Sequence, residues 1–190
     1  MVLRVTKLGE DVLRQKSEPV AEVNDEIKQL VEDMFETMYS YDGVGLAGPQ
    51  VDKSLRLFVI DVGDNVRRAF INPQIIKTSE EVGEYDEGCL SIPNVYESII
   101  RPLKVTVQAL NEKGRPFTLD ADGLLARAIQ HEYDHLEGIL YIDRGDKDFA
   151  DKTEAQFKKR AERAAEKAKA KEAKAKKIAA KLAAKAAKDK

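Results

Sequence analysis

The segment His131-Glu132-Tyr133-Asp134-His135 constrains this chain more than any other part of its sequence. On a helix, residues four apart lie on one face, a turn from each other, so both imidazoles can reach one metal ion while Glu132 stands beside it. These are the only 2 histidines in the 190 residues. The segment therefore predicts a helix that carries a metal site.

The helix around this segment is expected to run from Asp122-Gly123 to about Gly138. At about 100° per residue, one face, which we interpret as buried, carries Leu124, Ala128, His131 and His135. Another face, which we interpret as polar, carries Arg127, Gln130 and Asp134. Because imidazoles in a core need polar partners, the histidines bind either a metal or a hydrogen-bond network. In the second case Glu132 is a surface acid.

The third metal ligand has to come from outside this helix. A catalytic metal commonly has three protein ligands and one open position. Metzincins take the third ligand from a histidine six residues after the second, but that position is Tyr141 here. Downstream acids such as Asp143 or Glu154 are alternatives. Cys89, the single cysteine, is the better candidate, because a thiolate binds soft and borderline metals strongly.

The rest of residues 1–148 predicts an α+β domain, with short antiparallel sheets packed around the metal-binding helix. A second, N-terminal helix is expected from residue 24 or 25 to about residue 41, because its apolar residues recur at a spacing of three and four. Four segments are expected to pair as two hairpins: 55–62 with 68–72, and 104–110 with 116–119. No crossover helix separates these strands, which favours antiparallel pairing.

Residues 149–190 are expected to form a separate Lys/Ala-rich helical tail. Residues 151–190 contain 15 Lys and Arg against 6 Asp and Glu, whereas residues 1–150 contain 17 against 28. Ala and Lys favour a helix, so the tail is either a solvated helix or partly disordered. The excess of cations also suits a phosphate backbone, which predicts salt-sensitive binding to RNA.

The composition also bears on the compartment. A single cysteine excludes an internal disulfide, which fits a reducing compartment. No segment approaches the ~18 apolar residues of a membrane span, and the N-terminus lacks the apolar run of a signal peptide. We expect a monomeric cytoplasmic protein without membrane attachment.

A glycine-rich segment, Gly43-Val44-Gly45-Leu46-Ala47-Gly48-Pro49-Gln50, precedes the first expected strand. It lacks the Gly-Lys-Ser/Thr ending of a P-loop, and no strand precedes it as in a dinucleotide-binding fingerprint. From its residues alone, this segment is a turn between a helix and a strand.

Three motifs together resemble those of peptide deformylases, in order and in spacing: residues 43–50, Glu87-Gly88-Cys89-Leu90-Ser91 and residues 130–136. The resemblance extends from Leu3 to about Arg144. It implies a metal-dependent hydrolase that removes the N-formyl group from the formyl-methionine of nascent peptides and releases formate. It also implies iron(II) as the working metal, with nickel or cobalt as common substitutes, although zinc outranks iron(II) in intrinsic affinity.

The resemblance gives the residues around the metal separate roles. Cys89, His131 and His135 are the implied metal ligands. The metal lowers the pKa of a water, so that hydroxide is available near neutral pH. Glu132 is the implied general base, which takes the water's proton and passes it to the leaving amine.

The resemblance also implies the groups that bind the substrate. The Gln50 side chain and the Leu90 backbone N–H stabilise the oxyanion. The implied substrate-binding residues are Gly43, Val44, Gly45, Glu87, Gly88, Leu124 and Ala128. The three glycine-rich positions accept an extended peptide like an added strand, and Val44, Leu124 and Ala128 help to line the methionine pocket. Arg101 is expected to pair with Glu87 and to brace the site.

Two residues depart from the family pattern. Gly48 stands where the family commonly has alanine, which is expected to loosen the loop before Gln50. Arg127 occupies a position near the pocket that is often apolar, although the helical projection puts it on the polar face. Neither departure affects the ligands or the base.

Two other functions fit parts of the sequence. A zinc endopeptidase of the His-Glu-x-x-His type would cleave internal peptide bonds, and its third ligand would not be Cys89. An RNA- or ribosome-binding protein with a structural metal would bind through the tail without turnover. Some bacterial deformylases use a basic C-terminal helix to dock at the ribosomal tunnel exit, so residues 151–190 are an expected ribosome contact in the main interpretation as well.

Overall fold

The computed structural model describes residues 1–188, with side chains described for residues 1–176. Positions 189–190 of the expected tail lie outside the described residues. The chain divides into two compact units, Met1–Ala150 and Asp151–Lys190. They are considered one at a time below.

The first unit has helices toward both ends and the strands β2 to β7 in one run between them. In chain order its elements are the 3-10 helix η1 (Asp11–Arg14), α1 (Asp25–Ser40), β1 (Gly45–Ala47), the 3-10 helix η2 (Gly48–Val51), β2 (Leu57–Ile60), β3 (Arg68–Thr78), β4 (Val82–Cys89), β5 (Ile92–Pro102), β6 (Lys104–Leu110), β7 (Pro116–Asp122), α2 (Gly123–Leu136) and the 3-10 helix η3 (Tyr141–Arg144). The helix α3 (Lys147–Lys188) follows.

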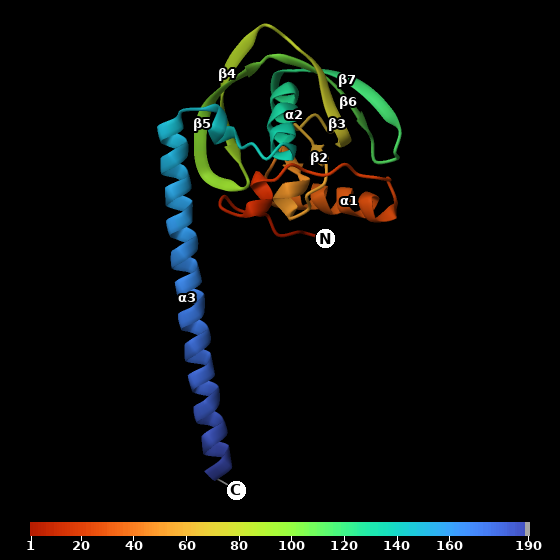
Figure 1. Ribbon diagram of the computed structural model, residues 1–190. Coiled ribbons are helices and arrows are strands. Elements are labelled where there is room, and N and C mark those ends of the chain that lie inside the picture. The colour runs from red at the N-terminus through yellow and green to blue at the C-terminus, as the bar shows by residue number, and fades with distance from the viewer. Residues whose placement is uncertain (189–190) are drawn as a thin grey trace. The chain divides into compact units, whose positions relative to one another are not determined.

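Within the described residues the strands form two antiparallel sheets (Figure 1). One has five strands in the order β1-β2-β3-β6-β7, and the other is the hairpin β4-β5. The pairings of β2 with β3 and of β6 with β7 confirm the two expected hairpins. The α+β fold with antiparallel sheets around the metal-binding helix is therefore confirmed.

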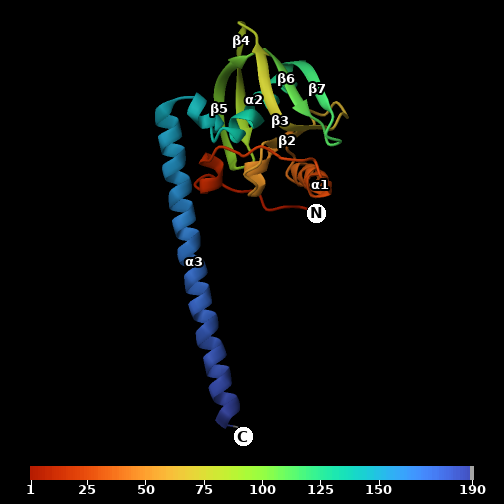
Figure 2. The same cartoon turned by 45° about the vertical axis from the view of Figure 1, so that its right-hand side comes forward.

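The five-stranded sheet has a helix on each face, as both views show (Figure 2). Alternate residues of β2 explain this arrangement, because successive side chains of a strand point to opposite faces. Phe58 and Ile60 belong to the core cluster that contains residues of α2. Leu57 and Val59 belong to the cluster that contains residues of α1. The strand β2 is thus buried between the two helices.

The N-terminal helix α1 confirms the expected boundaries. Asn24 caps it, since its side-chain Oδ1 accepts a hydrogen bond from Ile27 N at 3.0 Å. Its apolar face buries Val31, Met34, Phe35 and Met38, as the spacing of three and four indicates.

The β4-β5 hairpin is the element that the sequence does not predict. The β4 sequence contains two glycines and three acidic residues, and its side chains are mostly exposed, so it lacks the alternation of a half-buried strand. The strand β5 is 11 residues long and contains prolines at positions 93 and 102. Strands β3 and β5, at 11 residues each, are also longer than the short strands expected.

The polar face of α2 is buried, which corrects the interpretation of that helix. Arg127, Gln130 and Asp134 have exposed fractions of only 8%, 7% and 5%, whereas Leu124, assigned to the buried face, is 41% exposed. The β4-β5 hairpin covers the polar face, as its hydrogen bonds show. Periodicity finds the apolar face of a helix, but it cannot reveal a polar partner for the opposite face.

Gly48 does not loosen the loop before Gln50, contrary to expectation. It is buried, and its carbonyl accepts a hydrogen bond from Lys53 N at 3.0 Å. A β-carbon at this position would lie 2.7 Å from Leu55 O and 2.8 Å from Lys53 O. The glycine therefore permits close backbone packing.

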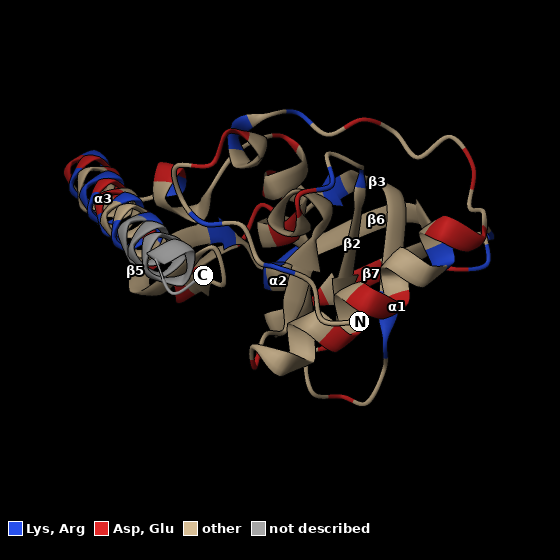
Figure 3. Cartoon of the chain, turned by 90° about the horizontal axis from the view of Figure 1, so that it is seen from below, with Lys and Arg blue, Asp and Glu red and all other residues tan. Residues whose placement is uncertain are grey.

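The second unit is described through α3, which is helical to Lys188. Figure 3 shows basic and acidic residues, blue and red on the ribbon, distributed along this helix. From Lys158 to Lys176 every side chain is exposed, and Lys176 pairs with Glu172 at 2.7 Å. The helix is thus exposed to solvent over this range, whereas Thr153 and Phe157 before it are buried. No helix in the described part of the chain is both long and apolar enough to cross a membrane.

Asn72 gives a test of how β3 is joined to the N-terminal segment. Its backbone φ is 50°, and its side chain exchanges two hydrogen bonds of 2.8 Å with the backbone of Val20. We expect Asn72→Ala to lower the free energy of unfolding by about 1–3 kcal/mol, because it leaves buried backbone groups unpaired. Chemical denaturation of the full chain measures this loss.

The matched control is Asn65→Ala. Asn65 has a φ of 60° but is exposed in the turn after β2, so this variant shares the backbone strain and not the hydrogen bonds. Equal losses in the two variants would contradict the prediction.

Candidate metal centre

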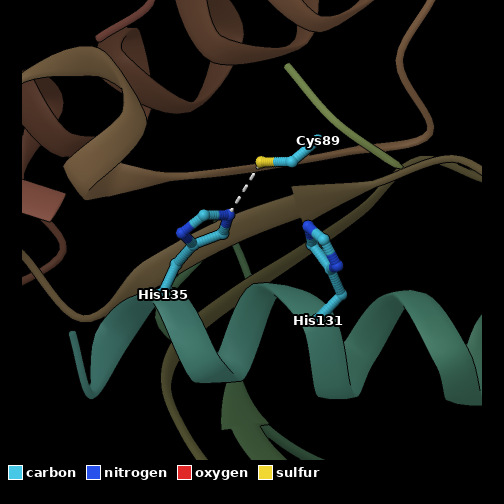
Figure 4. A group of neighbouring side chains, drawn as sticks. All are labelled: Cys89, His131 and His135. Atoms are coloured by element: carbon cyan, nitrogen blue, oxygen red, sulfur yellow. Dashed lines mark hydrogen bonds between the residues drawn. The ribbon is translucent and has the colours of Figure 1, made fainter. Parts of the chain in front are cut away.

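The two histidines of α2 lie side by side in the interior of the first unit (Figure 4). They are one turn apart, 9% and 1% exposed, and their ring centroids are 5.2 Å from each other. The helix begins after Asp122, where Gly123 has a φ of 53° that favours glycine. The local sequence thus fixes where the helix starts and which face both imidazoles share.

Cys89 reaches the histidines from the β4-β5 hairpin. It is the last residue of β4, next to an irregularity in the pairing of β4 with β5 at Gly88 and Cys89. Its Sγ lies 3.3 Å from His135 Nε2, and the ligand atoms of Cys89, His131 and His135 all lie within 4.8 Å of one another. Within the described residues, these three side chains form a group that could hold a metal ion.

These donors fit a divalent metal. Zinc binds cysteine sulfur at about 2.3 Å and histidine nitrogen at about 2.0–2.1 Å, so ligand atoms around one ion are separated by distances like the 3.3 Å found here. Burial alone would raise the pKa of the Cys89 thiol, but the neighbouring His135 and His131 outweigh it and hold the pKa well below that of an ordinary cysteine. The thiolate, which is the form that binds metals, is therefore favoured.

His131 is oriented by a buried carboxylate. Its Nδ1 lies 2.8 Å from Glu87 Oε2, which leaves Nε2 free for a metal. Burial raises the pKa of Glu87, but the hydrogen bonds from His131 and Arg101 outweigh burial and lower the pKa to about 2. A carboxylate behind a ligating histidine fixes its tautomer and raises its basicity. His135 differs, because its buried Nδ1 has no partner in the described residues.

Arg101 holds this carboxylate in place. Its Nε donates to Glu87 Oε1 at 2.6 Å and its Nη2 to Glu87 Oε2 at 3.0 Å. Its Nη1 donates to Asp134 Oδ2 at 2.7 Å. Arg101, Glu87 and Asp134 are all buried. Arg101 and Glu87 therefore form a bidentate ion pair inside the protein.

Glu132 is buried beside the histidines, so it is not a surface acid. Its side chain is 4% exposed, and its Oε2 has no hydrogen-bond partner in the described residues. Burial raises the pKa of Glu132 to about 7, so the carboxyl can both accept and release a proton near neutral pH. Gly45 permits this position, because a β-carbon there would lie 2.4 Å from Glu132 Oε1.

The Gln50 amide is held with its nitrogen toward Cys89. Its Oε1 accepts a hydrogen bond from Ala47 N at 2.8 Å. Its Nε2 lies 3.3 Å from Cys89 Sγ and 3.3 Å from Ser91 Oγ. Since Oε1 is engaged by a backbone N–H, the side chain presents an N–H donor to the metal side of the site.

A pocket of about 600 Å³ opens onto these groups. Gln50, Cys89, Leu90, His131 and Glu132 line it, and so do the seven expected substrate-binding residues, Gly43, Val44, Gly45, Glu87, Gly88, Leu124 and Ala128. Arg101 and His135 stand behind the lining. The separate sequence segments that were assigned to one site therefore meet around one cavity.

Several lining residues were not predicted, among them Lys7, Tyr41, Tyr85 and Tyr96. Tyr41 stands two residues before Gly43, and Tyr85 two residues before Glu87, so their nearness to the motifs was the available signal. Lys7 carried no such signal. Its Nζ donates to Leu90 O at 2.7 Å across 83 residues of sequence.

The residues rejected or left open as third ligands have other partners. The ring of Tyr141 stacks on His131 with a centroid distance of 5.8 Å, and its hydroxyl donates to Val95 O at 2.9 Å. Asp143 accepts hydrogen bonds from Arg14 and from Leu140 N. Glu154 belongs to the second unit. Cys89 is the residue that joins the two histidines.

Comparison with known proteins gives a consistent result. A model of the polypeptide deformylase family matches residues 2–150. The peptide deformylase of Treponema pallidum is 55% identical over 139 residues, which cover 73% of this chain and 85% of the relative. That of Fusobacterium nucleatum is 49% identical over 146 residues, covering 76% and 84%.

Solved structures agree with the sequence comparisons. A crystal structure of a peptide deformylase from Thermotoga maritima has a TM-score of 0.75 at 43% identity and covers 77% of this chain and 99% of its own. One from Synechococcus elongatus, in complex with actinonin, has a TM-score of 0.74 at 46% identity, with 76% and 81% covered. With the family model matching residues 2–150 and its cysteine and two histidines within reach of one ion, the chain belongs to the peptide deformylase family of metal-dependent enzymes.

Proposed function

We propose that Cys89, His131 and His135 hold the metal with which the chain removes the N-formyl group from the formyl-methionine of nascent peptides. The observation that carries the proposal is the convergence of these three ligand atoms within 4.8 Å. Two of the ligands, Cys89 and His131, line the same pocket as Glu132 and Gln50. A divalent metal bound there supplies a Lewis acid for the formyl carbonyl and lowers the pKa of the attacking water.

Glu132 is the proposed general base and acid. Its buried carboxyl, with a pKa of about 7 and no partner on Oε2 in the described residues, is free to take a proton from water. It then delivers that proton to the amine nitrogen as the C–N bond breaks. The formyl carbon leaves as formate, and the peptide keeps a free amino terminus.

Gln50 and Leu90 are the proposed donors to the oxyanion. The hydrogen bond from Ala47 N to Gln50 Oε1 fixes the amide, so its Nε2–H is already aimed into the site before substrate binds. Leu90 follows Cys89 directly, so its backbone N–H belongs to the peptide unit beside the thiolate. Fixed donors at the developing negative charge stabilise the transition state without reorganisation.

The substrate is proposed to bind as an added strand beside β1. In the sheet order β1 is an end strand with β2 as its neighbour, which leaves its other edge available. Val44 and Leu124 are 42% and 41% exposed, and both line the pocket together with the buried Ala128. An extended peptide can pair with the open edge while its methionine side chain contacts these apolar residues.

The endopeptidase alternative is not favoured. It requires a third ligand other than Cys89, whereas Sγ of Cys89 lies 3.3 Å from His135 Nε2. The family match over residues 2–150 also supports deformylation rather than cleavage of internal peptide bonds.

Iron(II) is the proposed working metal, with zinc, nickel or cobalt as substitutes. One thiolate and two imidazoles suit all four ions. The relatives from Treponema and Fusobacterium are bacterial, which supports a bacterial cytoplasm as the compartment.

Residues 1–148 are proposed to form the deformylase domain, because all of the pocket-lining residues lie between Lys7 and Glu132 and the family model ends at residue 150. Residues 149–190 are proposed to be a separate basic tail that contacts the ribosome. The support is an exposed helix with an excess of cations, which suits a phosphate backbone.

The first test is release of formate from a formyl-methionyl tripeptide. We expect release by the metal-loaded chain, and a kcat about 10²–10⁴-fold lower for Glu132→Gln, because this variant cannot accept the water's proton. Glu112→Gln, in the turn between β6 and β7 where the Glu112 side chain is 44% exposed, is the control and keeps full activity. Absence of formate from the metal-loaded parent would overturn the function, and an unchanged kcat in Glu132→Gln would overturn the role of Glu132.

The second test is the metal content of chain purified without oxygen. We expect about one iron per chain, and a loss of at least 10-fold in metal affinity for Cys89→Ser, because a hydroxyl replaces the thiolate. Elemental analysis and chelator competition measure both. Full metal binding by Cys89→Ser would contradict the ligand assignment, and activity with zinc alone would contradict iron.

The third test concerns the tail. Five lysines are changed to glutamine, which keeps the helix length and propensity but removes charge: Lys167, Lys169, Lys171, Lys174 and Lys176. We expect ribosome binding to weaken and its salt dependence to become shallower, since each phosphate contact adds about one to the slope. Turnover of the tripeptide stays within about twofold.

The control changes the same five lysines to arginine, which preserves the charge, and should retain ribosome binding. Equal ribosome affinity of the glutamine variant and the parent would rule out the tail as the contact.

A further inference from the structure

The polar face of α2 fastens the β4-β5 hairpin to the helix. Arg127 Nη2 donates to Gly83 O on β4 at 2.8 Å, and Arg127 Nη1 donates to Ile99 O on β5 at 2.8 Å. One side chain therefore reaches both strands. Gln130 and Asp134, on the same face, add bonds to Pro102 O at 3.0 Å and to Arg101 at 2.7 Å.

Arg127 also touches the carboxylate that orients a histidine. Its Nη1 lies 3.1 Å from Glu87 Oε1, while Glu87 Oε2 receives His131 Nδ1 at 2.8 Å. With the two bonds from Arg101, each oxygen of Glu87 has two partners. A carboxylate has about four acceptor sites, so Glu87 is saturated and has little freedom to turn away from His131.

The hairpin and the helix carry different parts of the metal centre. Cys89 is on β4, whereas His131 and His135 are on α2. The hairpin is a sheet of its own, and an isolated two-stranded sheet is marginally stable in water. The distance between the thiolate and the imidazoles therefore depends on what holds the hairpin to α2.

We propose that Arg127 is a positioning residue for the metal: it sets the place of Cys89 through both strands of the hairpin and the orientation of His131 through Glu87. The inference rests on the proposed ligand set of Cys89, His131 and His135. Arg127 is suited to the task because its guanidinium is a rigid fork, whose Nη2 bonds to Gly83 O and whose Nη1 bonds to Ile99 O and Glu87. Lysine carries all its donors on one nitrogen.

The test compares zinc affinity, measured by competition with a chelator, in full-length Arg127→Met, Arg127→Lys and parent protein. Zinc is used because it does not oxidise. We expect zinc binding about 10–100-fold weaker in Arg127→Met, the range for loss of groups that orient metal ligands. Arg127→Lys should be intermediate, since it restores the charge beside Glu87 but not the bonds to both strands.

Arg67→Met is the matched control. Arg67 is exposed, pairs with Glu32 at 2.8 Å and covers the Phe35 ring on α1. The variant therefore removes an arginine without changing a contact of the hairpin. It should bind zinc like the parent. Thermal unfolding of each metal-free variant separates a loss of folding from a loss of affinity. If Arg127→Met does not fold, Arg127→Lys decides the question.

The absorption spectrum of the cobalt(II)-loaded protein reports ligand geometry directly. The parent should show a thiolate-to-cobalt band, and Arg127→Met should shift or weaken it. Absence of the band in the parent would refute Cys89 as a ligand, and with it the proposed function. The role of Arg127 alone would be overturned by a different result. In that result the parent shows the band, and the folded Arg127 variants have unchanged cobalt spectra and a zinc affinity within twofold of the parent.

Discussion

The buried carboxylate of Glu87 joins the parts of this structure that the chain supplies from distant positions. It receives hydrogen bonds from Arg101 on β5, from Arg127 on α2 and from His131. Removing one charged partner from such a group is costly, since breaking a buried ion pair commonly costs about 3–5 kcal/mol. The negative charge that helps a histidine to bind metal thus also requires two arginines to be buried with it.

The helix α2 can lie in the interior because its apolar face packs on apolar residues and its polar face forms hydrogen bonds. Ala126, Ile129 and Leu136 pack in the cluster shared with the five-stranded sheet. The opposite face bonds to the hairpin through arginine, glutamine and aspartate side chains. The histidines and Glu132 lie between these two contacts, so water is excluded from them except through the pocket. That exclusion raises the pKa of Glu132 to about 7.

Local patterns predicted α1, the β2-β3 and β6-β7 hairpins and the face shared by the histidines, because each is encoded by spacing within about twenty residues. The β4-β5 hairpin was not predicted, since the glycines and acidic residues of β4 do not alternate with apolar residues. Arg127 was placed only on a polar face, without partners, because Gly83 O and Ile99 O are 44 and 28 residues away. Cys89 was joined to the histidines by its chemistry, and Gln50 and Leu90 only by family resemblance.

The open edge of β1 has a consequence beyond the active site. The strand is 3 residues long, and Gly48 begins a tight 3-10 turn directly after it. Very short edge strands are one means by which proteins avoid pairing with the sheets of other molecules. An edge of this length also offers few backbone hydrogen bonds, and such bonds do not distinguish one side chain from another. Most of the selectivity for any chain that docks there therefore has to come from side-chain contacts outside the strand.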